Sequence, residues 1–217
     1  MSEPETEDRD RGTPSGTTVA GAQNRPVSLR RPHKSTVILG VDPGTALTGY
    51  GVLEKSGTKL RALAYGVVRT PSDAPLHDRL DRLFGELSEL LRVYSPDAAA
   101  VESLFFNVNV KTALAVGHAR GVALLACSRQ GCALFEYTPQ QVKQAVVGYG
   151  KADKRQVQEM VRTLLALKAV PRPDDAADAL GVAICHANSH ELLSRAAATA
   201  PQGAGERRRR ARGTGPR

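Results

Sequence analysis

The sequence lacks tryptophan and has few other aromatic residues, which make up 4% of its 217 residues. Cysteine is also scarce: the three copies are Cys127, Cys132 and Cys185. Because this number is odd and no two cysteines have CxxC spacing, the sequence encodes neither a disulfide framework nor a cysteine zinc site.

Long apolar runs are missing as well. The longest, Thr112–Cys127, is interrupted by His118 and Arg120, so no membrane span is expected. Residues 1–20 contain several acids and no apolar core of a secretory signal, which argues against secretion. These absences predict a soluble, cytoplasmic protein with no membrane partner.

Apolar residues make up 41% and charged residues 24% of the chain, a composition that supports a packed core. The net charge of +8 points to an acidic partner such as nucleic acid, but it is distributed unevenly. Residues 201–217 carry +5 and residues 36–200 only +2. We therefore predict a disordered extension at 1–35, a single domain at 36–195 and a disordered basic tail at 196–217. The tail could be a solubility segment or a sequence-independent phosphate contact.

Apolar periodicity between residues 36 and 195 alternates between that of strands and that of helices. Strands are expected at 36–41, 50–54, 60–70, 98–101 and 133–137. Helices are expected at 76–94, 111–129, 138 to about 147, 153–167 and 174–193. The second and third strands alternate apolar and polar residues, as antiparallel partners do. Three strands followed by alternating helices and strands predict an α/β fold with a five-stranded mixed sheet.

Two acidic residues stand at the carboxyl ends of predicted buried strands, where open α/β sheets form their sites. Asp42 follows the first strand within Asp-Pro-Gly, and Glu102 follows the fourth. A carboxylate in such a place is unfavourable unless it is paired, protonated or bound to a metal. Asp42 alone could equally be a turn former, so its interpretation depends on the acids elsewhere.

The last predicted helix adds Asp174, Asp175 and Asp178. Asp175 and Asp178 share a helix face, as do Asp174 and Asp178. Acids in a first turn commonly cap a helix, and Asp174 is the better N-cap, but capping does not explain Asp178. Carboxylates from two strand ends and one helix could surround a pair of divalent ions, and oxygen ligands favour Mg²⁺ or Mn²⁺ over zinc.

Four segments together resemble, in order, the RuvC-type Holliday-junction resolvases, the crossover junction endodeoxyribonucleases. They are ILGVDPGTALTGYGVLE (38–54), VESLFFNVNVKTALAVGHARG (101–121), FEYTPQQVKQAVVGYGKADKRQVQEMV (135–161) and DDAADALGVAICHA (174–187). Several motifs in a shared order are far more specific than any one of them. The resemblance implies a ribonuclease-H-like fold with helices on both faces of the sheet. It also implies a homodimer that resolves four-way DNA junctions with Mg²⁺ by paired symmetric nicks, in homologous recombination and DNA repair.

The same resemblance implies that Asp42, Glu102, Asp175 and Asp178 are the catalytic acids and metal ligands. Asp175 is preferred to Asp174 because the family has two acids separated by two residues before the pattern A-L-x-x-A. Two Mg²⁺ ions per active site, for which Mn²⁺ should substitute, would reverse the local charge and activate a water. By the resemblance, in-line attack would leave 5′-phosphate and 3′-hydroxyl ends.

Six further residues are predicted DNA contacts: Phe105, Lys143, Tyr149, Lys151, Lys154 and Arg155. The phenylalanine is a candidate wedge that stacks on an unpaired base at the junction. The others lie in or around a glycine-containing loop at 148–150, where cationic side chains can pair with phosphates. The family's motif favours Lys143 and Lys154 as DNA or transition-state contacts.

Small residues at Ala113, Gly117 and Gly121 would let a second helix approach the helix 111–129. Such a helix usually packs within its own chain, but the family pairs its protomers here, and a two-fold dimer suits the symmetry of the junction. A branch-migration complex is a further partner that the resemblance implies.

Two other functions stay open at this point. DPGTALTGYG (42–51) resembles the first phosphate loop of actin-like kinases and ATPases, although the folded region is long enough for only one of their two lobes. A non-catalytic junction-binding protein is the second alternative, and it would not need all four acids.

Overall fold

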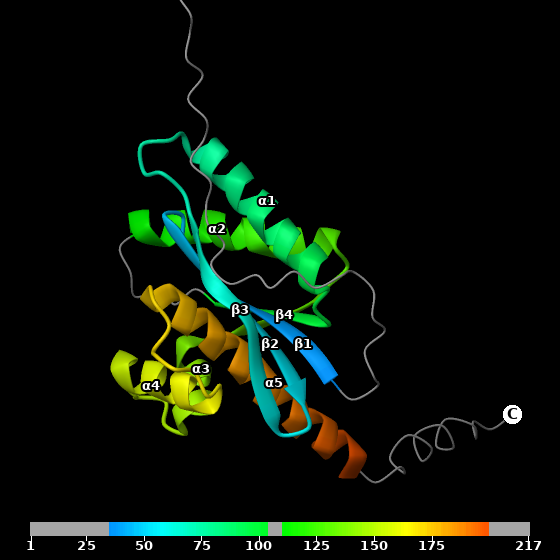
Figure 1. Ribbon diagram of the computed structural model, residues 1–217. Helices are drawn as coiled ribbons and strands as arrows, with labels where there is room; N and C mark the ends of the chain where they lie inside the picture. Colours follow the sequence, from blue (N-terminus) through cyan, green and yellow to red (C-terminus); the bar gives the residue numbers. More distant parts are fainter. Residues whose placement is uncertain (1–34, 104–109, 200–217) are drawn as a thin grey trace, which may run out of the picture.

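A five-stranded mixed sheet lies at the centre of the protein (Figure 1). The computed structural model describes residues 35–103 and 110–199. The strands are β1 (Ser35–Asp42), β2 (Leu47–Ser56), β3 (Lys59–Arg69), β4 (Ala98–Glu102) and β5 (Ala133–Tyr137). Their order is β3-β2-β1-β4-β5, with β1–β2 and β2–β3 antiparallel and β1–β4 and β4–β5 parallel. The predicted mixed sheet and its antiparallel pair are thus confirmed.

Five helices cover the two faces of this sheet: α1 (Leu76–Tyr94), α2 (Val110–Arg129), α3 (Pro139–Val147), α4 (Lys154–Leu164) and α5 (Asp174–Thr199). The pair α1 and α2 lies on one face and α3, α4 and α5 lie on the other (Figure 1). The last helix continues past its predicted end at residue 193, because residues 195–198 read Arg-Ala-Ala-Ala and favour helix. No helix within the described ranges is long and apolar enough to cross a membrane.

Capping residues fix where α3 and α4 begin. Thr138 and Asp153 each accept a hydrogen bond from the backbone N–H three residues later, and a glutamine at that later position completes both capping boxes. Gly148, with φ of +80°, ends α3 in the left-handed conformation that glycine adopts without strain. These caps place Lys154 in the first turn of α4, next to the start of α5.

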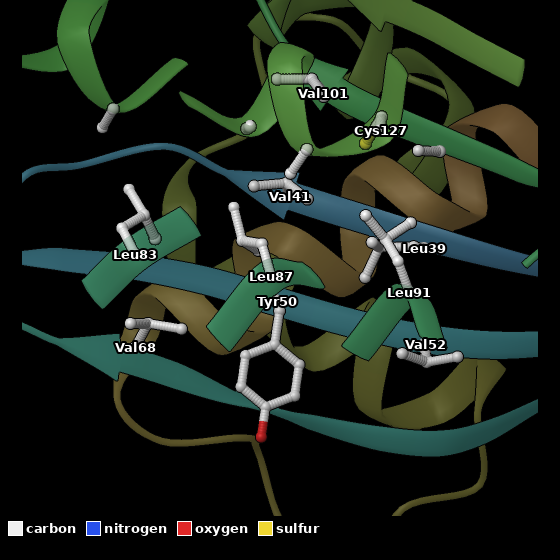
Figure 2. Close-up of a cluster of buried hydrophobic side chains, with 14 of the residues drawn as sticks. Leu39, Val41, Tyr50, Val52, Val68, Leu83, Leu87, Leu91, Val101 and Cys127 are labelled. Atoms are coloured by element: carbon white, nitrogen blue, oxygen red, sulfur yellow. The ribbon is translucent and has the colours of Figure 1, made fainter. Parts of the chain in front are cut away.

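The alternation of β1 divides the core between the two faces. Val37, Leu39 and Val41 pack against α1 and α2, and Figure 2 shows two of them with the leucines of α1. Ile38 instead packs in a second cluster with α3, α4 and α5. Since side chains alternate along a strand, Asp42 faces the same side as Ile38. The first acid therefore points to the side covered by α5.

Glycines bring α5 unusually close to the sheet. A Cβ atom on Gly40 of β1 would lie 2.1 Å from the carbonyl oxygen of Ala179, and one on Gly49 of β2 would lie 2.0 Å from that of Asp175. Both distances are shorter than any real Cβ contact, so only glycine fits. The backbone of α5 consequently lies directly against β1 and β2, with its first turn beside the end of β1.

Candidate active site

Asp42 and Glu102 lie next to each other at the carboxyl ends of two neighbouring parallel strands. The register of β1 and β4 pairs Val41 with Val101, which brings the following two residues level. Ala100 packs in the cluster formed with α5, so Glu102, two residues later, faces the same side as Asp42. A side-chain hydrogen bond joins the two acids.

Asp42 lies close enough to the three other predicted acids for their charges to act on it. Burial raises the pKa of Asp42 to about 8, and the negative charges of Glu102, Asp178 and Asp175 contribute to that rise. Asp175 is placed by the contact of its backbone with Gly49, which pairs with Asp42 in the β1–β2 register. At neutral pH the cluster holds more carboxylates than it can ionise without a proton or a cation.

Two lysines border the acids and partly offset this repulsion. Burial, followed by the charge of Asp178, raises the pKa of Glu102, whereas Lys154 and Lys143 act in the opposite direction. Burial also raises the pKa of Asp178, and a hydrogen bond from Lys154 opposes that rise. Of the predicted DNA contacts, Lys143 and Lys154 are thus the two that act on the carboxylates.

The Lys154 ammonium bridges two acids at the start of α5. Its Nζ lies 3.0 Å from Oδ2 of Asp178 and 3.5 Å from Oδ2 of Asp174. Arg172 forms a second ion pair with Asp174. The helix begins at Asp174 itself, so this residue lies in the first turn and is not the N-cap that its position suggested.

The ion-pairing role of Asp174 and Arg172 is absent from the sequence prediction. The one available signal is that Arg172 precedes the acidic run by two residues, with a proline between them. That signal does not identify Lys154 as a partner, because the contact depends on how α4 packs against α5.

The other predicted DNA contacts lie elsewhere around the loop between α3 and α4. Tyr149 is 58% exposed, and Lys151 and Arg155 are also exposed. Phe105 lies outside the described residues. Three exposed side chains that can contact a nucleic acid therefore follow one another within one turn and the start of α4.

The donor set of the candidate site fits a divalent metal ion. Within the described part of the chain, no group of three or more His, Cys, Asp or Glu side chains is arranged to hold a metal ion as it stands. Asp42 shares a hydrogen bond with Glu102, and Asp178 is paired with Lys154. These half-buried carboxylates supply only oxygen ligands, which suit Mg²⁺ or Mn²⁺.

Known proteins are similar to this chain in sequence and in fold. The family model described as "Crossover junction endodeoxyribonuclease RuvC" matches residues 38–186. A relative with that description from Rubrobacter xylanophilus is 62% identical over 156 residues, covering 72% of this chain and 87% of the relative. Another, from Ruminiclostridium cellulolyticum, is 55% identical over 156 residues, covering 72% and 94%.

Solved structures agree with these relatives. Thermus thermophilus RuvC in complex with Holliday junction substrate is 39% identical, with a TM-score of 0.70, over 73% of this chain and 97% of that one. The yeast mitochondrial Holliday junction resolvase Ydc2 is 17% identical, with a TM-score of 0.56, over 76% and 83%, and shares the fold alone.

The mixed sheet, the acids at its strand ends and these structural matches define a nuclease with a ribonuclease-H-like fold. The family model covers more than half of the chain, and the relatives match along nearly their whole length. The protein belongs to the RuvC family of crossover junction endodeoxyribonucleases. The predicted family, fold and enzyme class are therefore confirmed, and the actin-like kinase alternative is set aside.

Proposed function

We propose that this protein resolves four-way DNA junctions by paired symmetric nicks, using divalent metal ions held by Asp42, Glu102, Asp175 and Asp178. The observation that carries the proposal is the cluster of half-buried, mutually repelling carboxylates around the ends of β1 and β4. Its support from comparison is the related protein of Thermus thermophilus, which was solved with a Holliday junction. We further propose a cytoplasmic location and a branch-migration complex as partner, both from family membership.

The chain's own residues prepare this site for metal and phosphate. When bound, two Mg²⁺ ions, or Mn²⁺ in their place, supply the Lewis acidity that activates a water and stabilises the leaving oxygen. Asp42 must lose the proton that its raised pKa retains, which also frees Glu102 to act as a ligand. Lys143 and Lys154 border these acids and would attract and orient the phosphate to be cut.

The remaining DNA contacts are proposed to hold the arms of the junction. Tyr149, Lys151 and Arg155 are exposed near Lys154, where a backbone crossing the acids would pass. Phe105 is proposed as the wedge at the point of strand exchange, a role that rests on the family's motif alone. In-line attack by water would leave 5′-phosphate and 3′-hydroxyl ends.

The metal requirement and the chemistry of the ends are tested together on a labelled synthetic junction. With a chelator we expect no cleavage, and restored cleavage after addition of Mg²⁺ or Mn²⁺. DNA ligase should reseal the products, since it joins only 5′-phosphate to 3′-hydroxyl. Undiminished cleavage in chelator would overturn the metal proposal, and nicks that ligase cannot seal would overturn the proposed ends.

A homodimer through α2 is part of the proposed function. Leu114 and Leu125 are 62% and 52% exposed, and a Cβ added at Gly121 would meet open space. Their spacing of seven and four residues places these three residues on one side of the helix. Exposed apolar residues on one side of a helix are typical of a protein interface, and we propose that a second copy of the chain covers this side.

We expect Leu125→Glu to convert the dimer to monomer, because it would bury a charge against the apolar side of the partner's α2. Sedimentation velocity measures the change. The paired nicks on a junction should then become uncoupled single nicks. Leu76→Glu, on an exposed leucine of α1, is the matched control and should leave the dimer intact. A Leu125→Glu protein that sediments like the wild type would rule out this interface.

A further inference from the structure

The ammonium of Lys154 is paired with a carboxylate that is also a proposed metal ligand. The ammonium lies 3.0 Å from Oδ2 of Asp178, one of the four proposed ligands, and that side chain is 27% exposed. A carboxylate oxygen so engaged is less available to a second cation, and the ammonium charge would repel a divalent ion entering beside it. A metal ion that binds Asp178 would therefore compete with the ammonium for this carboxylate.

Asp174 offers the ammonium a second place nearby. Its Oδ2 already lies 3.5 Å from the same Nζ, so a small rotation of a side chain that is 56% exposed is enough. The Arg172 guanidinium pairs with the other oxygen of Asp174 and keeps that carboxylate at the start of α5.

We propose that Lys154 is an internal counter-ion which occupies Asp178 until a metal ion replaces it, and that Asp174 is the positioning residue which then takes over its ammonium. The inference rests on the proposed metal site at Asp178. It gives Asp174 a role without making it a metal ligand. After the exchange, the ammonium stays at the edge of the site, where the phosphate of the substrate would lie.

The test is the affinity of the full-length protein for Mn²⁺ alone, without DNA, measured calorimetrically and from the paramagnetic signal of free Mn²⁺. Lys154→Met removes the competing charge and keeps the apolar stem, so it should tighten Mn²⁺ binding by roughly three- to thirtyfold. Asp174→Asn removes the second place for the ammonium and should weaken binding by roughly two- to fivefold. In the double variant, Asp174→Asn should have almost no additional effect, because no ammonium is left to be received.

A control variant and a check of folding separate the role of Lys154 from a general effect of charge or of unfolding. Lys151→Met removes an equal charge from an exposed lysine three residues earlier and should change the affinity less than Lys154→Met does. All the substituted side chains are exposed or half-buried, and thermal melting checks that each variant folds.

Three results would overturn the inference. If the wild type binds no Mn²⁺, the proposed metal site itself fails. If it binds Mn²⁺ and Lys154→Met does not tighten binding, only the counter-ion role fails. If Asp174→Asn weakens binding equally with and without Lys154, then Asp174 is a direct ligand and not a positioning residue.

Discussion

Asp42→Asn should abolish junction cleavage, lowering its rate by at least about a thousandfold, while junction binding stays within about threefold of the wild type. Asparagine keeps the shape of the side chain but removes the negative charge that the proposed ions need at the end of β1. The proposed DNA contacts are cationic or exposed side chains, which the substitution leaves in place. Single-turnover cleavage of a labelled junction and a gel-shift titration in chelator measure the two quantities.

A control acid separates this effect from a general loss of charge. Asp78 on α1 is 63% exposed, so Asp78→Asn should leave both cleavage and binding unchanged. Cleavage by the Asp42→Asn protein at close to the wild-type rate would eliminate the proposed role of Asp42.

The pH dependence of stability gives a second readout of the same substitution. Burial, together with the neighbouring acids, raises the pKa of Asp42 from 3.8 to about 8 in the folded protein. Between these values the folded protein holds a proton that the unfolded chain has lost, so this residue makes stability fall as pH rises. In chelator, the free energy of unfolding of the Asp42→Asn protein should therefore be higher than that of the wild type by about 2–4 kcal/mol near pH 9. Near pH 4 the two proteins should be almost equally stable. Urea unfolding measures the difference, and a gap that does not grow with pH would contradict this electrostatic account.

Gly49→Ala should destabilise the protein by about 3 kcal/mol or more and reduce cleavage even where the protein remains folded. The new Cβ would lie 2.0 Å from the carbonyl oxygen of Asp175, which is helix backbone and cannot rotate away. Either β2 or the first turn of α5 must move. Since Gly49 pairs with Asp42 across β1 and β2, that movement separates Asp175 from Asp42.

Urea unfolding and cleavage per folded molecule measure the two effects. Gly85→Ala is the matched control, because a Cβ there meets nothing within 4 Å and the residue lies in α1. Because alanine favours helix more than glycine does, the free energy of unfolding of the Gly85→Ala protein should rise by about 0.5–1 kcal/mol. A Gly49→Ala protein as stable and active as the wild type would show that α5 does not lie this close to β2.

Much of the fold follows from local sequence signals. The capping boxes at Thr138 and Asp153 and the apolar period of α1 are local features, and the elements that they predict are present. The direction in which Asp42 points is different, because β1 is apolar on both faces and shows no alternation. Its direction depends on which residues pack against α5, and that is a property of the assembled sheet.

Part of the candidate site also follows from the sequence, and part depends on how the elements pack. Glu102 could be linked to Asp42 because acids at the ends of parallel strands meet at one edge of a sheet. The spacing of Asp174, Asp175 and Asp178 left two of the acids as alternatives, since a shift of one residue in the helix start changes which of them faces the sheet. The contact with Lys154 comes from the packing of α4 on α5, which no local pattern encodes.

The overall charge was a poor guide to the site. The net charge of +8 suggests a nucleic-acid partner, yet residues 36–200 carry only +2 of it. The residues proposed to bind DNA are instead a few cations around a group of acids, and the charges of Lys143 and Lys154 act on one of these carboxylates. For this protein, the positions of individual charged residues indicate the proposed DNA-binding site better than the net charge does.

Comparing cleavage of a synthetic four-way junction with cleavage of a linear duplex of the same sequence decides whether the protein is a junction-selective nuclease. Both substrates are incubated with the protein and Mg²⁺, and the positions of the cuts are mapped on denaturing gels. We expect paired, symmetric nicks in two junction strands of like polarity and no cleavage of the duplex. Equal cutting of both substrates, or hydrolysis of ATP without any nick, would show that the protein is not a junction-selective nuclease.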